Sequence, residues 1–396
     1  MPERVATREA RLVLAAALSC FFLSGVAALL YEVVWTRYLG VTFGHTVHAI
    51  TTVLAVYMGG LALGSALAGA VADRTRHPLR LYGLLEAAIG LYCLATPILF
   101  GAADAVYLWA HRLLRPGPAG AAGLHLVISA ALLLPPTTLM GATLPILARG
   151  IVSRQRLAAA DIGRLYAVNT CGAVAGTVVT GFLLLPAIGL RTTIWLGVAL
   201  NVLVAAIAFG AGRRSLGPAS ERERPEAPAS DAQAPGSAPA TSRSLVLAVL
   251  AAFGLSGAAS MAYELAWTRA LSLVLGSSTY AFSAMLATFL VGLALGSALA
   301  SRVLSRRPLG AAAFGAVEVS IALATVALLP AFGRLPEAVL AVLAWTGVSH
   351  ATMLATQVAL GFGLMIVPTC LVGATFPLVV AAVGRGLARL GRDVGV

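Results

Sequence analysis

The sequence predicts an all-α integral membrane protein that contains an internal repeat. The chain has 396 residues, of which 59% are hydrophobic and 11% charged, whereas a soluble domain is about half apolar and about a quarter charged. Apolar stretches of membrane-spanning length follow one another along the chain, and motifs of the first half return in the second. This composition excludes a soluble enzyme, a disordered chain and a small disulfide scaffold.

About ten stretches between ionisable residues are long enough to cross a bilayer as helices. They lie near residues 12–36, 46–72, 81–103, 120–148, 165–189, 192–212, 245–267, 277–301, 309–333 and 350–384. The fourth and tenth are overlong and contain prolines, so we expect each to be kinked or broken inside the bilayer. Between the third and fourth, residues 105–114 are expected to form a short interfacial helix.

The first stretch follows arginines, as in a signal peptide, but it continues past Cys20 without a cleavage-like break. The same segment recurs in mid-chain, so we interpret it as a retained helix. Residues 213–244 are rich in Pro, Ala, Ser, Glu and Arg without apolar periodicity. That composition predicts a disordered cytoplasmic linker between an N-terminal repeat, 1–212, and a C-terminal repeat, 245–396.

All 27 basic residues are arginines, and they give the chain a net charge of +12. Most lie in loops on one side, such as the loop with Arg74, Arg76 and Arg80. The opposite loops hold Arg37, Arg112, Arg115, Arg191, Arg269 and Arg334. The positive-inside rule predicts a cytoplasmic N-terminus in a multi-pass protein of the plasma (inner) membrane. No basic strip with interleaved aromatic residues suggests nucleic acid, and the lack of lysine excludes Schiff-base chemistry within the chain.

The repeat is the most specific feature of the sequence. The motif Tyr31-Glu32-Val33-Val34-Trp35-Thr36-Arg37 returns, 232 residues later, as Tyr263-Glu264-Leu265-Ala266-Trp267-Thr268-Arg269. The same offset relates Glu86 to Glu318, Gly60–Ala68 to Gly292–Ala300 and Gly141–Pro145 to Gly373–Pro377.

Both copies begin on the cytoplasmic side, so the repeat is parallel. Two six-helix halves related by an axis along the membrane normal form the major-facilitator arrangement. The second copy shows only four of its six helices, and we therefore expect a major-facilitator-like bundle with a truncated second repeat, encoded by a truncated reading frame or a fragment.

Carboxyl groups inside a membrane are costly, which makes Glu32, Glu86, Glu264 and Glu318 candidate substrate-binding or structural groups. Glu32 shares a helix face with Trp35 and Thr36, whereas Arg37 lies off that face. One interpretation places Glu32 about 7 to 8 Å below the outer end of its helix, in an interfacial network anchored by Trp35. The same alternatives apply to Glu264 with Arg269. Glu86 and Glu318 either bind substrate or pair with an arginine on a neighbouring helix.

Other chemistry has little support in the sequence. The glycine-rich stretches suggest close helix packing, His45 and His48 lack further metal ligands, and no nucleophile motif is present. Cys20, Cys93, Cys171 and Cys370 are interpreted as small hydrophobic residues. We therefore expect no catalytic residue, no metal and no cofactor in this chain.

The repeated Tyr-Glu-x-x-Trp-Thr-Arg motif, the Gly-Leu-Ala-Leu-Gly-Ser-Ala stretch, the Gly-Ala-Thr-x-Pro segment and Tyr166-Ala167-Val168-Asn169-Thr170 together resemble the membrane domain of the fused major-facilitator-like/spermidine synthase family. The resemblance covers nearly the whole chain outside the linker. It implies a cytoplasmic aminopropyltransferase domain that lengthens putrescine, and the residues of this chain contain none of that domain's catalytic pattern.

Two functions follow as hypotheses. The first is the membrane module of a polyamine-synthesising protein, which anchors a separate catalytic domain or channels substrate to it. The second is a freestanding secondary transporter of a small, cationic solute. A membrane scaffold that transports nothing is a plainer third alternative. The expected partners are the lipid bilayer, a polyamine or other small solute, and a cytoplasmic catalytic domain.

Overall fold

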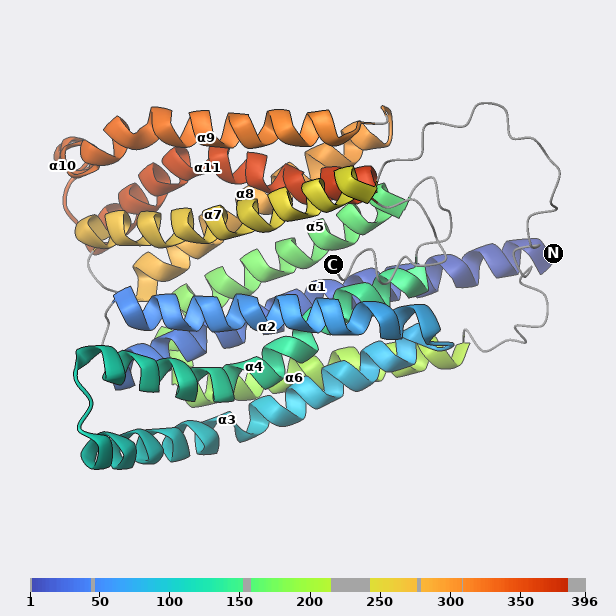
Figure 1. The fold of residues 1–396 in the computed structure, drawn as a ribbon, viewed down its shortest axis with the longest axis horizontal. Helices are drawn as coiled ribbons and strands as arrows, with labels where there is room; N and C mark the ends of the chain where they lie inside the picture. Colours follow the sequence, from blue (N-terminus) through green and yellow to red (C-terminus); the bar gives the residue numbers. More distant parts are fainter. Residues whose placement is uncertain are drawn as a thin grey trace.

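The computed structural model describes residues 2–43, 47–151, 158–214, 243–275, 279–307 and 309–383, and every regular element in these ranges is helical (Figure 1). The elements are α1 (Pro2–Phe43), α2 (Val47–Arg74), α3 (Pro78–Leu114), α4 (Pro118–Ile151), α5 (Ala158–Val179), the π-helical turn η2 (Thr180–Leu184), α6 (Leu185–Arg214), α7 (Arg243–Leu275), α8 (Thr279–Leu304), α9 (Ala311–Gly333), α10 (Leu335–Thr346) and α11 (His350–Val383).

Nine apolar stretches of the described helices are long enough to cross a membrane, and they include all ten predicted spans. The fifth and sixth spans run together from Leu165 to Arg213 through η2. They are separated by Gly189, whose φ of 72° and ψ of 177° interrupt the helix. The chain is therefore an all-α, multi-pass membrane protein. The predicted linker, apart from its first two and last two residues, lies outside the described residues.

The helices bear on two local predictions. The proline-containing fourth and tenth spans, expected to be kinked or broken, are not broken: α4 contains Pro135, Pro136 and Pro145, and α11 contains Pro368 and Pro377. Neighbouring helices allow prolines inside membrane helices to be tolerated without a break. Residues 105–114 form no separate helix, because α3 continues to Leu114. Their equivalents in the second half do form a separate helix, α10.

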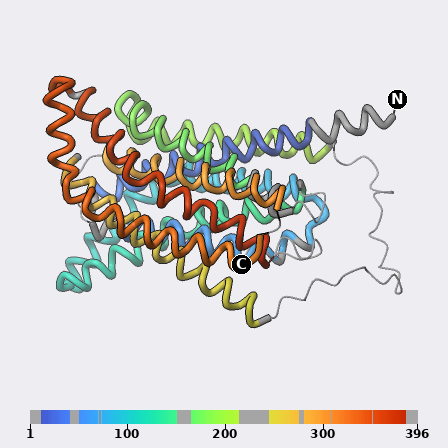
Figure 2. Tube along the Cα trace, turned by 90° about the horizontal axis from the view of Figure 1, so that it is seen from above, coloured from blue at the N-terminus to red at the C-terminus, as the bar shows by residue number. Residues whose placement is uncertain are grey.

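The two halves of the chain lie on opposite sides of the bundle (Figure 1). In the first half, α2 packs on α4, and α6 packs on both α1 and α3. In the second half, α8 and α9 both pack on α11. The α5 helix packs on α1 of its own half and along α8 of the other (Figures 1 and 2). At this crossing, a methyl group at Gly181 of η2 would collide with the Ser283 hydroxyl of α8.

The pair α2 and α4 and the pair α8 and α11 make the same contacts, residue for residue. A methyl group at Gly60 would collide with Thr137, and one at Gly292 would collide with Thr369, the residue 232 positions beyond Thr137. Each threonine hydroxyl donates a hydrogen bond to a carbonyl one turn earlier in its own helix, at 2.6 Å for Thr137 and 2.7 Å for Thr369. The hydroxyl is therefore satisfied inside the bilayer, and the helices approach closely through glycine.

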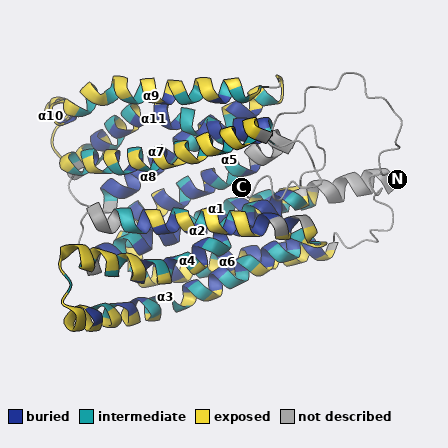
Figure 3. Ribbon diagram, viewed as in Figure 1, coloured by how far each residue is buried: buried dark blue, intermediate teal, exposed yellow. Residues whose placement is uncertain are grey.

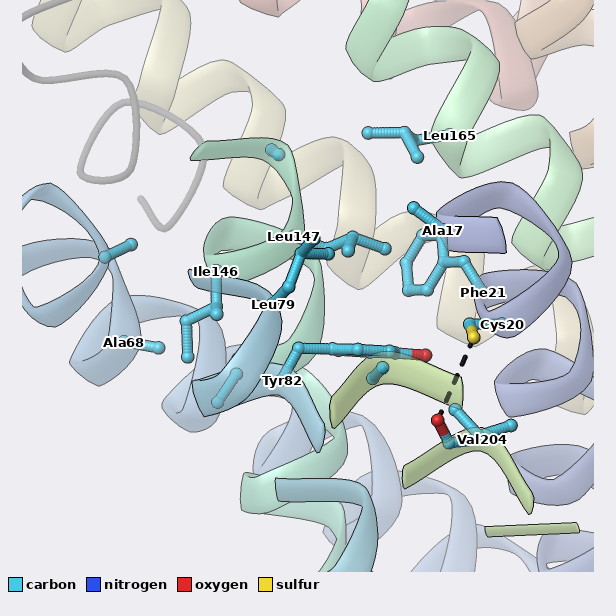
Figure 4. Packing of buried hydrophobic residues seen from close by; sticks show 14 of the residues in the cluster. Ala17, Cys20, Phe21, Ala68, Leu79, Tyr82, Ile146, Leu147, Leu165 and Val204 are labelled. Atoms are coloured by element: carbon cyan, nitrogen blue, oxygen red, sulfur yellow. Dashed lines mark hydrogen bonds between the residues drawn. The ribbon is translucent and has the colours of Figure 1, made fainter. Parts of the chain in front are cut away.

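Buried apolar clusters fill the bundle at both ends. One cluster, with Phe21, Tyr82 and Ile146, lies nearest the arginine-rich loops, and there the Cys20 thiol is 3.8 Å from the carbonyl oxygen of Val204 (Figure 4). A second cluster joins the two halves, because Val33 of α1 packs with Trp267 of α7 and Met285 of α8. Glu32 precedes Val33, and Glu264 lies three residues before Trp267, so both candidate carboxyls are close in sequence to members of this cluster.

Replacing Gly60 by alanine is expected to lower the free energy of unfolding by about 1–3 kcal/mol, because the added methyl overpacks the contact with Thr137. Gly292→Ala should cost a similar amount. Gly59 has no atom within 4 Å of the position that its Cβ would take, so Gly59→Ala is the matched control and should be nearly neutral. Thermal unfolding in detergent measures the difference, and equal losses at Gly59 and Gly60 would contradict the proposed contact.

Candidate functional site

The four intramembrane carboxyls lie in three different environments. Glu32 on α1 and Glu264 on α7 are each 1% exposed, and Glu86 on α3 is fully buried. Glu318 on α9 is half-buried. The internal repeat therefore relates Glu32 to Glu264 and Glu86 to Glu318. The first two are both buried, whereas Glu86 is buried and Glu318 is only half-buried.

Glu86 is held by a hydrogen-bonded network inside the first half. The Ser24 hydroxyl of α1 donates to Oε1 at 2.6 Å, and the Asn201 amide of α6 donates to Oε2 at 2.7 Å. The Tyr31 hydroxyl in turn donates to the Asn201 amide oxygen at 2.8 Å. Both carboxylate oxygens thus have donors, and α1, α3 and α6 are joined through one side chain.

This network corrects the prediction that Glu86 pairs with an arginine on a neighbouring helix, because its partners are a hydroxyl and an amide. Uncharged donors satisfy the oxygens without bringing a second charge into the bilayer. Glu318 has no equivalent network: in the described part of the chain its Oε1 is buried and lacks a donor. Ser256 occupies the position in α7 that Ser24 occupies in α1, and no described residue is equivalent to Asn201.

Glu32 and Glu264 both lie where the two halves meet. Val33, next to Glu32, packs in one buried cluster with Trp267, which lies three residues after Glu264. Within the described residues, neither oxygen of either side chain has a hydrogen-bond donor. Two carboxyls from equivalent positions of the repeats thus lie at the junction of the halves, buried and without a hydrogen-bond donor among the described residues. We define this pair as the paired-carboxyl site.

Aromatic residues flank each carboxyl in the sequence, and their rings stack in the same pattern. Tyr31 stacks on Trp35 with ring centroids 5.5 Å apart, and Tyr263 stacks on Trp267 at 5.7 Å. Trp35 is next to Tyr57 of α2, with ring centroids 6.5 Å apart.

In the second half, Phe289 takes the position of Tyr57, at 6.4 Å from the Trp267 ring. The aromatic frame is therefore repeated, but only the first half carries a hydroxyl in it. That hydroxyl donates to the Ala28 carbonyl at 3.1 Å.

The prediction that Trp35 anchors the helix at the membrane interface is wrong. Its side chain is fully buried, and its Nε1 has no acceptor among the described residues. The Thr36 hydroxyl is likewise buried without a described partner, whereas Thr268 donates to the Glu264 backbone carbonyl at 2.7 Å. An indole N–H and a hydroxyl therefore remain available on the same helix as Glu32.

The two arginines of the repeated motif do not join this site. Arg37 is half-buried and Arg269 is exposed, and no ion pair links either to a carboxylate in the described part of the structure. This agrees with the expectation that Arg37 lies off the face of Glu32. The repeated motif thus contributes its acid and its aromatic residues to the interior, and its cation lies nearer the surface.

Sequence reasoning missed three residues of these networks. Asn201 is a lone amide in an apolar stretch, and Ser24 precedes a glycine in the repeat. An amide inside a predicted span signals a buried hydrogen bond, which was the available clue. Tyr57 gave no signal, because an aromatic residue in an apolar helix usually only packs.

The paired-carboxyl site can bind a cation, because carboxylate oxygens are acceptors and negative charges. The described residues contain no group of three or more His, Cys, Asp and Glu that could hold a metal ion. His45 and His48 lie outside the described side chains. The four cysteines are free, and Cys171 is exposed rather than buried.

Comparisons with known proteins identify no family. No protein-family model matches the chain, and no curated protein matches it either. The assignment to a class therefore depends on the fold and the site: the chain is a polytopic membrane protein with a duplicated helical unit and a pair of buried carboxyls between its halves.

Removing the Ser24 hydroxyl tests the Glu86 network. Ser24→Ala leaves a buried carboxylate oxygen without its donor, and we expect a loss of about 1–3 kcal/mol in the free energy of unfolding. The repeat-related Ser256→Ala is the control, since Glu318 Oε1 has no donor to lose. Chemical unfolding in detergent gives both values. Indistinguishable effects of the two substitutions would show that the network contributes nothing to stability.

Proposed function

We propose that this chain is the membrane module of a polyamine-handling protein and that Glu32 and Glu264 together bind a small cationic solute between the two repeats. One observation carries the proposal: both carboxyls are buried at the junction of the two halves, and neither has a described hydrogen-bond donor. The two repeats supply one carboxyl each.

The physical reason is the cost of an uncompensated charge in a medium of low dielectric constant. An isolated buried carboxylate is strongly disfavoured, and a neighbouring carboxylate adds repulsion. A cation between the two removes both penalties. Intramembrane acids that lack partners are for this reason typical of substrate and ion pathways.

The surroundings favour an organic cation. Trp35 and Trp267 each stack on the tyrosine that precedes one of the glutamates in the sequence, and aromatic faces attract ammonium groups. A linear amine with apolar methylenes between its charges would place an ammonium at each carboxyl and its carbon chain between the aromatic rings. The motif resemblance stated above supports a polyamine as that amine.

The proposed function requires the membrane organisation that the sequence predicts. The repeats form a major-facilitator-like bundle in the plasma membrane, with a cytoplasmic N-terminus. In the first version of the function, this module anchors a separate cytoplasmic aminopropyltransferase domain or channels polyamine to it, as the resemblance implies. No residue of this chain acts in that catalysis.

A second candidate is a freestanding secondary transporter of the same solute. The observation that favours it is the position of the paired-carboxyl site at the junction of the repeats, where alternating access exposes a site to either side in turn. Fold-level analogy alone does not specify the transported substrate.

Binding of radiolabelled spermidine to the purified full chain in nanodiscs tests the site. Glu32→Gln and Glu264→Gln are each expected to weaken binding by about tenfold or more, because a charge-assisted hydrogen bond contributes about 1.5–3 kcal/mol. Glu318→Gln is the control and should bind as the parent does, since Glu318 lies on the outer helix α9. Unchanged binding in both Glu32→Gln and Glu264→Gln would overturn the proposed site.

Flux measurements separate the two versions of the function. A freestanding transporter should accumulate labelled putrescine or spermidine in vesicles, and the double variant Glu32→Gln/Glu264→Gln should reduce uptake to the level of empty vesicles. A module that only binds and delivers its solute should show binding without flux. Flux that persists in the double variant would exclude this pair as the transport site.

A further inference from the structure

Three buried hydroxyl groups lie where α5 and η2 cross α8. They belong to Thr177 of α5, Thr180 of η2 and Ser283 of α8, and each of these side chains is fully buried. None of the three hydroxyls has a hydrogen-bond partner among the described residues. We call them the crossing hydroxyls. Two come from the first repeat and one from the second, and the proposed function uses none of them.

The geometry of the crossing brings these residues to one place. A methyl group at Gly181 would collide with the Ser283 hydroxyl, so this hydroxyl lies against the backbone of η2. Thr180 directly precedes Gly181, and Thr177 lies four residues before Gly181, on the same face of the helix. The Ser283 hydroxyl of the second repeat therefore lies beside the turn that carries both threonines of the first.

The crossing is shielded from lipid and from bulk water. A methyl group at Gly176, which precedes Thr177, would collide with Val26 of α1, so α1 closes one side. In the most apolar 18-residue stretch of α8, 72% of the residues are buried, the largest share among the described spans. Figure 3 shows buried residues along this helix. The crossing hydroxyls therefore need a partner inside the bundle.

Other buried hydroxyls of the same two helices have such a partner in their own helix. Thr170 of α5 donates to the Tyr166 carbonyl, and Thr288 of α8 donates to the Ala284 carbonyl, both at 2.8 Å. Donation to the preceding turn is a common way for a serine or threonine inside a helix to satisfy its hydroxyl. The crossing hydroxyls do not make this bond, which leaves their donors and acceptors available to a guest.

The chemistry of a hydroxyl restricts what that guest can be. Each hydroxyl has one donor and two acceptor lone pairs. A cation satisfies only the lone pairs, and no member of the cluster carries a negative charge, whereas water both donates and accepts. A water bonded to two hydroxyls spans about 5–6 Å, twice the usual O–H···O distance of about 2.7–2.8 Å. Side chains three or four residues apart on a helix are separated by about the same distance.

We infer that the crossing hydroxyls form a binding site for ordered water, which joins α5 and η2 of the first repeat to α8 of the second. A buried water typically makes about three hydrogen bonds to polar groups that otherwise lack partners, and the crossing offers three hydroxyls. Water-mediated hydrogen bonds are nearly as favourable as direct ones. The site is formed by other residues than the paired-carboxyl site, and the inference does not depend on the proposed function.

A structure of the full chain in nanodiscs, at a resolution that shows ordered water, tests the site directly. Density is expected within hydrogen-bond distance of all three crossing hydroxyls. The variant Thr177→Val/Thr180→Val/Ser283→Ala keeps similar side-chain shapes and should lack this density. Thr288→Val is the matched control, because its hydroxyl bonds within α8, and it should keep the density.

Two results of that experiment overturn the inference. In the first, the crossing hydroxyls donate to carbonyls of their own helices and no density lies between them. In the second, the density is present in sodium chloride and absent in choline chloride, which identifies a cation instead of water.

Thermal unfolding of Ser283→Ala in detergent provides a second, independent measurement. If water is bound, the substitution removes one of its partners and should lower the unfolding temperature. If the crossing is dry, the substitution removes a buried hydroxyl without a partner and should raise that temperature. An unchanged or raised unfolding temperature therefore also overturns the inference.

Discussion

Both repeats depend on the close approach of two helices through glycine, α2 on α4 and α8 on α11. Inside a bilayer, lipid chains are as apolar as leucine, so helices associate through van der Waals contact and interhelical hydrogen bonds rather than through the hydrophobic effect. Gly60 and Gly292 allow a threonine from the partner helix to enter the space that a side chain would fill. Because these contacts recur at equivalent residues in both halves, each repeat contains the same closely packed helix pair.

The acidic residues show how the same side chain acquires different roles from its neighbours. Glu86 has two uncharged donors and joins three helices. None of the carboxyl oxygens of Glu32 and Glu264 has a hydrogen-bond donor among the described residues, which leaves them available to a cation. Glu318 is the repeat equivalent of Glu86, and its Oε1 has no donor in the described part of the chain. The distribution of donors, rather than the position of the acid, therefore separates a structural carboxyl from a candidate binding carboxyl.

Much of the fold could be predicted from the sequence, because apolar length and a constant offset of 232 residues are local properties. The buried acids were also predictable, since a carboxyl in an apolar stretch is conspicuous. Their partners were not: Asn201 reaches Glu86 from 115 residues away, and nothing local encodes that meeting. The burial of Trp35 was misjudged because a tryptophan near a helix end suits either an interface or a core. In the second half α9 and α10 are separate helices, whereas the equivalent residues of the first half form one helix, α3. The repeated motifs gave no indication of this difference.

The turn η2 and Gly189 lie where the chain passes from α5 into α6, two helices that pack on different partners. The α5 helix packs on α1 of its own repeat and on α8 of the other, whereas α6 packs on α1 and α3 of its own. Gly189 has a positive φ that other residues rarely adopt, and π-helical turns lack the regular hydrogen-bond pattern. A change in the angle between α5, which contacts both repeats, and α6, which contacts the first, would therefore be taken up at η2 and Gly189.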